Sequence, residues 1–345
     1  MKRYRVCQIG CSSGRGRDHA RAFVLNADRF EVVGLCDHIE ERLNGLGDEF
    51  AVAGRYTDAE KMLAEQKPDV LCFVTSPDIR LALVELGIRH GVKAIAYEKP
   101  MATNWPTACA IHRAVEAAGV KTIQSHQHKY GPHWTKAREL VAAGEIGEVQ
   151  EVRASSKGWM LHYASHLMDY SMFLAGRERV KWVVGHAHGR GKLEDNHPSP
   201  DYMLARYAFD DGVRGLLECG TMSPTLPPGT NSFWMDAGVT VLGTEGFVQV
   251  VVGSGVYARI RSSPALFRLA AAFDPAYDQP LYIRELADWL DDDAKVHSCN
   301  GARAFHGFEV FMGACLSALD RRRIDLPFRA DTDILGRMRA ELPAD

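Results

Sequence analysis

The first 125 residues alternate between short apolar runs and segments in which apolar residues recur every three or four positions. The apolar runs predict buried strands, and the periodic segments predict amphipathic helices. We expect strands at 4–10, 30–37, 69–76, 92–98 and 120–126, with helices between them at 17–27, 57–66, 79–91 and 104–119. Strands that alternate with helices indicate an α/β domain with a doubly wound parallel sheet.

The pattern changes after this point, because the strand-like runs become longer and alternate apolar with polar residues. Such alternation is typical of an antiparallel sheet with one covered face. We expect strands at 148–156, 180–189, 201–209, 213–221, 237–246 and 247–252, with helices at 133–147, 280–292 and 302–322. The Asp210–Asp211–Gly212 segment predicts a hairpin turn.

Two domains are expected, because a chain of 345 residues is longer than one hydrophobic core usually serves. Residues 1–125 should form the parallel α/β domain. Residues 126–345 should form an α+β domain with a large, mostly antiparallel, open-faced sheet that carries helices on one face.

The overall charge and the cysteines narrow the class of protein. A net charge of −3 gives no electrostatic basis for binding nucleic acid or an anionic membrane. No apolar run approaches the roughly 18 residues that a membrane span requires, and the basic start is followed by too few apolar residues for a signal sequence. The eight cysteines contain no C-x-x-C pair, so we expect reduced thiols in a cytoplasmic protein.

A glycine-rich segment, GCSSGRGRDH, stands between the first expected strand and the first expected helix. Glycines at this place allow a tight turn and let backbone N–H groups approach a pyrophosphate at the helix N-terminus. The spacing is G-x-x-x-G-x-G rather than the more usual G-x-G-x-x-G. The residues expected to contact a dinucleotide here are Gly10, Ser12, Ser13, Gly14, Arg15 and Gly16.

Asp37 ends the second expected strand, about 20 residues after the glycine segment. A carboxylate at this position accepts hydrogen bonds from the adenosine ribose and repels a 2′-phosphate, so we favour NAD over NADP. Arg15, His38 and Arg42 keep NADP open as the less favoured cofactor. A plain cap at the strand end is the structural alternative for Asp37.

Glu98 and Lys99 directly follow the fourth expected strand, in the stretch AIAYEKPMATN. The carboxyl ends of parallel strands are where open α/β sheets bind their ligands. An adjacent acid and base at this edge are therefore candidates for chemistry, with a solvated pair in a turn as the structural alternative.

These motifs together resemble the glucose–fructose oxidoreductase and inositol dehydrogenase (Gfo/Idh/MocA) family over essentially the whole chain. The most specific parts are the E-K-P at 98–100 and the His-x-x-Asp at 166–169. The supporting segments, in family order, are QIGCSSGRGRDHARAF, GLCD, DVLCFVTSP, YEKPMA, AAGEIGEVQEV, SHLMDYSMFLAG, YAFDDGVRGLLE and VLGTEGFVQV.

The resemblance implies a nicotinamide-binding Rossmann domain and a family that mostly oxidises sugar or polyol carbinols or reduces the ketones. It implies that Lys99 lies beside the nicotinamide and the reacting hydroxyl, while Glu98 helps to fix the strand end. The further cofactor contacts expected are Thr75, Ser76, Pro77, Glu98 and Lys99. An ammonium group can polarise the carbinol oxygen, and with a lowered pKa it can also relay the proton.

A second constellation lies in WMLHYASHLMDYSMFLAG, where His162, His166 and Asp169 share one helical face. Family members usually carry Asp-x-x-x-His here, so His166 matches the family histidine and His162 replaces the aspartate. We favour His166 as the acid/base, with His162 and Lys99 as polar partners of substrate oxygens, and expect no metal. Two alternatives stay open: a metal site made of the three side chains, and a structural role for His162 and Asp169.

Further departures from the family affect the substrate side. Lys129-Tyr130 stands where the family has Arg-Phe, which keeps the charge and loses the forked donor geometry. Leu81 replaces a frequent family histidine. The expected substrate contacts are Lys99, Lys129, Tyr130, Trp159, His162, Tyr163 and His166, with Asn231 and Trp234 as additional pocket candidates.

The sequence therefore predicts a cytoplasmic NAD-dependent dehydrogenase of a sugar or cyclic polyol, with Lys99, His166 and His162 as catalytic residues. Two other classes remain: a glycosidase or lyase that oxidises its sugar only transiently, and a sugar-sensing regulator without activity. We expect a homodimer or homotetramer built on the outer sheet face, because runs such as GLLECGTM and VTVLG are too apolar to stay exposed.

Overall fold

The computed structural model describes residues 2–224 and 232–343. The chain divides into two compact units, each with its own sheet. The first unit comprises Met1–Ala102, Cys109–Gln127 and Pro275–Ala304. The second comprises Thr103–Ala108, His128–Asp274 and Phe305–Asp345. The predicted candidate Asn231 lies outside the described residues.

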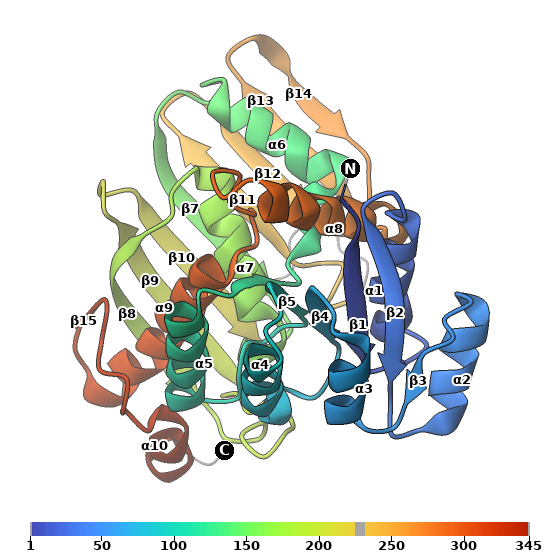
Figure 1. The fold of residues 1–345 in the computed structure, drawn as a ribbon. Helices are drawn as coiled ribbons and strands as arrows, with labels where there is room; N and C mark the ends of the chain where they lie inside the picture. Colours follow the sequence, from blue (N-terminus) through green and yellow to red (C-terminus); the bar gives the residue numbers. More distant parts are fainter. Residues whose placement is uncertain (1, 225–231, 344–345) are drawn as a thin grey trace. The chain divides into compact units, whose positions relative to one another are not determined.

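The first unit holds a parallel six-stranded sheet in the order β3-β2-β1-β4-β5-β6 (Figure 1). Its strands are β1 (Tyr4–Ile9), β2 (Phe30–Cys36), β3 (Arg55–Tyr56), β4 (Val70–Phe73), β5 (Ala94–Tyr97) and β6 (Lys121–Gln124). Its helices are α1 (Arg15–Leu25), α2 (Glu40–Glu49), α3 (Ala59–Gln66), the 3-10 turn η1 (Pro77–Ile79), α4 (Arg80–Arg89), most of α5 (Trp105–Ala118) and α8 (Pro275–Asp291). The strand order reverses between β1 and β4, which makes their carboxyl ends a topological switch point.

The predicted parallel α/β sheet is confirmed. Every residue of β4 and β5 is buried, as expected for strands covered on both faces. The sequence interpretation did not include α2 or the two-residue β3. Gly45 and Gly47 stand inside α2, and because glycine is a poor helix former the local signal for this helix is weak.

Helix α8 belongs to the first unit, although it lies far along the chain from the other elements there. It packs against α1, and its Asp291 accepts a 2.7 Å hydrogen bond from the Tyr4 hydroxyl of β1. Arg29 adds an ion pair with Asp288. The domain boundary expected at residue 125 assigns α8 to the second domain, because only tertiary packing shows that this helix belongs to the first unit.

The second unit holds a nine-stranded sheet in the order β14-β13-β12-β11-β7-β10-β9-β8-β15 (Figure 1). Its strands are β7 (Val149–Ser156), β8 (Val180–His188), β9 (Tyr202–Phe209), β10 (Arg214–Gly220), β11 (Gly238–Gly243), β12 (Phe247–Val251), β13 (Gly255–Ile260), β14 (Ser263–Leu269) and β15 (Ile324–Asp325). Its helices are α6 (Pro132–Ala142), α7 (Met160–Ala175), most of α9 (Gly301–Asp320) and α10 (Ile334–Glu341), and the 3-10 turn η2 (Gln127–Tyr130) leads into α6.

Among the strands of this sheet that the structure describes, only the β7–β10 pair is parallel, so the predicted mostly antiparallel sheet is confirmed. The predicted hairpin at Asp210–Gly212 joins β9 to β10, and Gly212 takes a positive φ of 88° there. Helix α7 lies across β7, β10 and β11 on one face of the sheet (Figure 1). Fourteen of its residues are buried, which makes α7 a core helix that holds its polar side chains in fixed positions.

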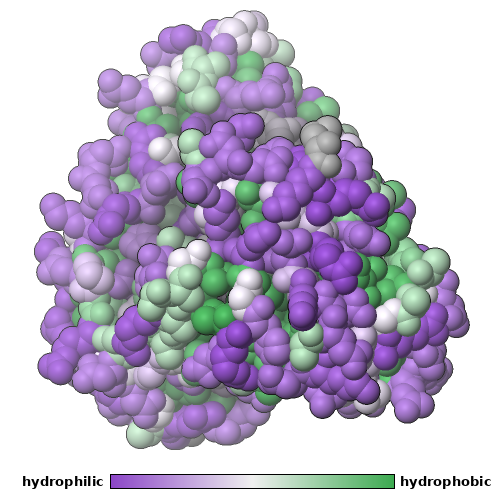
Figure 2. All heavy atoms as spheres, viewed as in Figure 1, coloured by the Kyte–Doolittle hydropathy of each residue, from purple (hydrophilic) through white to green (hydrophobic). Residues whose placement is uncertain are grey.

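Hydrophilic residues make up most of the surface in the view of Figure 2, and hydrophobic residues form separate patches among them. Among the described residues, none of the helices is long and apolar enough to cross a membrane. All eight cysteines are buried thiols.

Candidate active site

The glycine segment forms the turn between β1 and α1 at the switch point of the first sheet. Gly10 has a φ of +92°, and a Cβ there would lie 2.2 Å from the Val74 carbonyl oxygen. A Cβ on Gly16 would lie 2.7 Å from the Gly10 oxygen, whereas nothing lies within 4 Å of one on Gly14. The loop is thus tight against Val74, which follows β4, and open at Gly14, the N-cap of α1. This fits the close approach of a pyrophosphate.

Some residues of the loop stabilise it by hydrogen bonds, and others are exposed to solvent. The Ser12 hydroxyl accepts a 3.1 Å hydrogen bond from the Gly16 N–H, so it supports the first turn of α1. Ser13 and Gly14 are exposed. Thr75 and Ser76 follow β4 at the same edge, and the Arg80 guanidinium donates a 2.7 Å hydrogen bond to the Thr75 carbonyl. These positions suit backbone and hydroxyl contacts to a dinucleotide.

Asp37 lies directly after β2 with its carboxylate turned to the glycine loop. It accepts hydrogen bonds from the Cys11 N–H at 2.7 Å and from the Ile39 N–H at 2.9 Å. Asp37 is therefore part of the turn itself, and its remaining lone pairs can still accept from a ribose.

A pocket of about 730 Å³ opens beside this carboxylate, with both apolar and charged walls. It is lined by Cys11, Ser13, Arg17, Ile39, Glu41, Arg42, Gly45, Leu46 and Glu49. The size and mixed walls suit an adenosine moiety. Arg17 is paired with Glu49, and Arg42 also lines the pocket.

Glu98 is the centre of a buried polar network at the end of β5. Its Oε1 accepts hydrogen bonds from Arg15 at 2.8 and 2.9 Å and lies 3.0 Å from His19 Nε2. Burial opposes ionisation of Glu98, but the Arg15 guanidinium and His19 hold the pKa of this carboxyl well below its usual range. Gln279 of α8 completes the network, 2.9 Å from Arg15.

Arg15 is thus held by protein carboxylates, since it also pairs with Asp18 at 2.9 Å. The sequence interpretation placed it against the cofactor, and the structure adds a bracing role on the strand end that carries Lys99. His19 and Gln279 are members of the site that sequence reasoning missed. No local motif marks either of them, because both act through residues far away in the chain.

Lys99 follows Glu98 and is partly buried, with a cis peptide bond to Pro100. Burial lowers the pKa of its ammonium group to about 8, against the attraction of Glu98, which raises it. Arg80 and Arg15 lower the pKa further by repulsion. A lysine with this pKa exchanges its proton near neutral pH, as a proton relay requires.

In the second unit, α7 presents His166 among aromatic rings. The Tyr170 hydroxyl, one turn further along the helix, lies 2.9 Å from His166 Nδ1. The His128 ring stacks on His166 with centroids 5.0 Å apart and planes 9° apart. The Tyr170 hydroxyl therefore fixes the orientation of the His166 ring through Nδ1.

Lys129 and Asp169 form a buried ion pair, with 2.8 Å between Nζ and Oδ2 and about 2% of each side chain exposed. The predicted substrate contact Lys129 therefore also ties η2 to α7. Tyr163 donates its hydroxyl to the Trp234 carbonyl at 2.8 Å, and burial raises its pKa. Tyr130 is partly exposed.

The structure separates the three side chains of the alternative metal interpretation. Asp169 pairs with Lys129, and His166 lies against Tyr170, while His162 stacks on His197 with ring centroids 4.1 Å apart. Trp159 packs edge-on against His162 at 4.5 Å. The partner of His162 comes from a distant loop that sequence reasoning did not single out.

The first unit has a glycine turn, a carboxylate after β2 and a lysine after β5, which are features of a nicotinamide-dependent oxidoreductase of the Rossmann class. Residues 4–126 match the family described as "Oxidoreductase family, NAD-binding Rossmann fold" (GFO_IDH_MocA). Over these residues the chain is similar to that family, which confirms the resemblance seen in the motifs.

Two relatives of the chain are named as dehydrogenases of a sugar or a polyol. The chain is 33% identical over 240 residues to a D-apiose dehydrogenase of Paraburkholderia graminis, a match that spans 65% of this chain and 62% of that protein. It is 24% identical over 262 residues to the scyllo-inositol 2-dehydrogenase (NAD(+)) of Bacillus subtilis, spanning 70% and 73% of the two chains.

The fold extends the likeness to nearly the whole chain. A levoglucosan dehydrogenase in complex with NADH and levoglucosan superimposes with a TM-score of 0.80, at 13% identity, over 95% of this chain and all of that one. At this identity the likeness concerns the fold, in which a Rossmann sheet is followed by a large, mostly antiparallel sheet.

Proposed function

We propose that the protein is an NAD-dependent dehydrogenase that oxidises a carbinol of a sugar or cyclic polyol, or reduces the corresponding ketone. The observation that carries the proposal is Lys99. It stands at the carboxyl end of β5 beside an ionised Glu98, and its pKa is lowered to about 8. Substrates of this kind are named for D-apiose dehydrogenase, scyllo-inositol 2-dehydrogenase and levoglucosan dehydrogenase.

The glycine turn and Asp37 would hold the cofactor. Gly10, Ser12, Ser13, Gly14 and Gly16 would surround the pyrophosphate, with Thr75, Ser76 and Pro77 beside the nicotinamide half. The carboxylate of Asp37 favours a ribose diol over a 2′-phosphate, which supports NAD. When bound, the nicotinamide supplies the hydride acceptor or donor.

On the substrate side, the ammonium form of Lys99 would bind and polarise the carbinol oxygen. His166 would take the hydroxyl proton, while Tyr170 orients its ring through Nδ1. Glu98 would keep Lys99 at the strand end without touching the substrate. Lys129, Tyr130, Trp159, His162 and Tyr163 remain proposed substrate contacts. His162 is also proposed as a catalytic residue, and its ring stacks on His197.

The proposal is tested by incubating the purified protein with a panel of sugars and cyclitols, each with NAD and with NADP. Absorbance of the reduced cofactor is the readout, and inositols and branched pentoses belong in the panel because of the named relatives. Reduction of NAD in preference to NADP by at least one sugar or polyol is expected. A glycosidic substrate that is cleaved while reduced cofactor never accumulates would favour the glycosidase or lyase alternative instead.

A further inference from the structure

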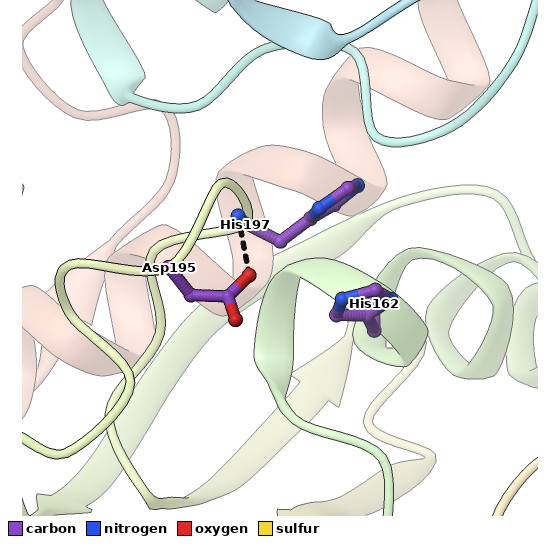
Figure 3. Close-up of side chains that lie close together, drawn as sticks. All are labelled: His162, Asp195 and His197. Atoms are coloured by element: carbon purple, nitrogen blue, oxygen red, sulfur yellow. Dashed lines mark hydrogen bonds between the residues drawn. The ribbon is translucent and has the colours of Figure 1, made fainter.

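The second unit brings three metal-ligating side chains together outside the proposed proton-transfer residues. They are His162 on the first turn of α7, and Asp195 and His197 on the loop between β8 and β9 (Figure 3). One donor atom from each lies within 4.8 Å of the other two, and all three side chains are partly exposed. We propose that His162, Asp195 and His197 form a binding site for a first-row divalent cation of the zinc type.

The donor set fits this class of ion. Two imidazoles and one carboxylate bind zinc and related divalent ions, and three protein ligands leave at least one coordination position open. Bonds of about 2.0–2.2 Å put tetrahedral donors roughly 3.3 Å apart. The donor atoms lie within 4.8 Å of one another, so they would have to move closer together to share one ion. The two rings stack at 4.1 Å with 27° between their planes, so a change in the orientation of the His162 ring would be part of this movement.

The loop holds His197 at α7 through a specific set of hydrogen bonds. The buried Ser199 hydroxyl accepts from the Leu161 N–H at 3.0 Å and donates to the His197 carbonyl at 2.9 Å. Lys192 and Ser199 form a bridge that closes the loop. The carboxylate of Asp195 accepts from the His197 N–H at 2.9 Å, as Figure 3 shows. The hydrogen bonds of the loop backbone therefore hold Asp195 and His197 next to α7.

A neighbouring amide selects the ring nitrogen that carries the lone pair. His197 Nδ1 lies 2.7 Å from the Asn196 side-chain oxygen. Because an amide oxygen only accepts, this contact places the proton on Nδ1 and the lone pair on Nε2. Metal-binding histidines are commonly oriented through their second nitrogen in this way.

The site contains groups of both charges, and the carboxylate of Asp195 is the one that favours binding of a cation. The positive end of α7 and Lys192, which lies 5.1 Å over the Trp159 ring, both disfavour a cation. Asp195 supplies the opposing negative charge. His166 is one helical turn from His162, so the two histidines lie on the same face of α7.

The test measures zinc and cobalt binding to full-length protein that has been dialysed against a chelator, with no cofactor or substrate present. Wild-type protein should bind about one equivalent of zinc, and cobalt should give the visible absorption of a low-symmetry site. Asp195→Ala and His197→Ala should each weaken binding by about 100-fold or more, and Asn196→Ala by about tenfold. His186→Ala, at an exposed histidine of β8, is the matched control and should bind zinc like the wild type.

Less than about a tenth of an equivalent in the wild type at micromolar zinc would overturn the inference. Equal binding by wild type and the two ligand variants would overturn it as well, and the three side chains would then form an aromatic and hydrogen-bonded cluster only. Circular dichroism of each variant shows that it is folded. Because the readout is stoichiometry rather than turnover, this result is independent of the proposed dehydrogenase activity.

Discussion

At the scale of single residues, Glu98 and Lys99 show how neighbours in the chain acquire different ionisation. Both are withdrawn from water, which disfavours charge on either. Arg15 and His19 lower the pKa of Glu98, so this carboxyl stays ionised. The pKa of Lys99 is raised by one carboxylate, Glu98, but burial and two guanidinium groups together lower it further than that. The lysine is therefore the group of the pair that is set to exchange a proton.

The lowered pKa of Lys99 predicts a pH dependence of the activity. Lysine is protonated below its pKa, so the ammonium that polarises the carbinol oxygen is present at neutral pH and is lost as the pH rises through about 8. We expect kcat/KM to fall above that pH. Lys99→Arg is the matched variant, because arginine stays charged throughout this range, and its residual activity should lack this decline. A wild-type profile that rises steadily through pH 8 to 10 would contradict the assignment.

Asp37 predicts the choice of cofactor. Hydrogen bonds to a charged group contribute about 1.5–3 kcal/mol each, and 1.4 kcal/mol corresponds to tenfold in affinity. Asp37→Ala should therefore weaken NAD binding about tenfold or more and relax the discrimination against NADP, as measured by titration of both cofactors.

The Asp37 carboxylate also accepts from the Cys11 and Ile39 N–H groups, so a control for loss of the turn is needed. Asp37→Asn keeps one acceptor for these backbone groups and removes the charge. It should keep thermal stability closer to the wild type while still losing discrimination against NADP. Wild-type preference for NADP would mean that Arg42 or His38 captures the phosphate.

At the scale of elements, the buried Lys129–Asp169 ion pair ties η2 to α7, beside the stacking of His128 on His166. Removing one partner of a buried pair leaves a charge in a place from which water is excluded, at a cost of about 3–5 kcal/mol. Asp169→Asn should reduce the free energy of unfolding in urea by about this amount, and a double change, Lys129→Met with Asp169→Leu, should recover most of it.

The exposed Lys136–Glu139 pair on α6 provides the comparison. Lys136→Met should change the free energy of unfolding by less than about 0.5 kcal/mol, because exposed ion pairs contribute little. A similar small loss for Asp169→Asn would show that the Lys129–Asp169 pair does not hold α7 in place.

The same elements show what the sequence can predict. The turn from β1 to α1, the carboxylate after β2 and the acid–base pair after β5 are local features, so patterns of a few residues identify them. Gln279 beside Arg15, and His197 beside His162, come together only through tertiary packing, which no local pattern encodes. Strands β13 and β14 were missed because segments such as SPALFRL lack a clean alternation, and Pro264 lowers the strand signal further.

At the scale of the whole molecule, the large sheet has a covered and an uncovered face. Leu217 and Val239 are fully buried, while their neighbours Leu216, Glu218 and Thr240 are partly exposed on the other face. The apolar residues that are buried in these strands therefore lie on the face beneath the helices. The other face carries both apolar and polar side chains. The predicted cytoplasmic location stays a prediction.

We still expect a homodimer or homotetramer through this uncovered face, because leucine side chains persist on it between the polar ones. Light scattering at micromolar concentration should give at least twice the mass of one chain. Leu216→Arg, at a partly exposed position, should shift the protein towards the monomer without unfolding it. A wild-type monomer at that concentration would rule the assembly out.

The proposed reaction depends most on Lys99 as the residue that acts on the substrate oxygen. The decisive measurement compares wild type and Lys99→Ala in two assays, turnover on the best substrate of the sugar and cyclitol panel and NAD affinity by titration. We predict that turnover falls by about 1,000-fold or more, a loss of roughly 4 kcal/mol in the barrier, while NAD affinity stays within about twofold. Turnover at the wild-type rate in Lys99→Ala would contradict the account.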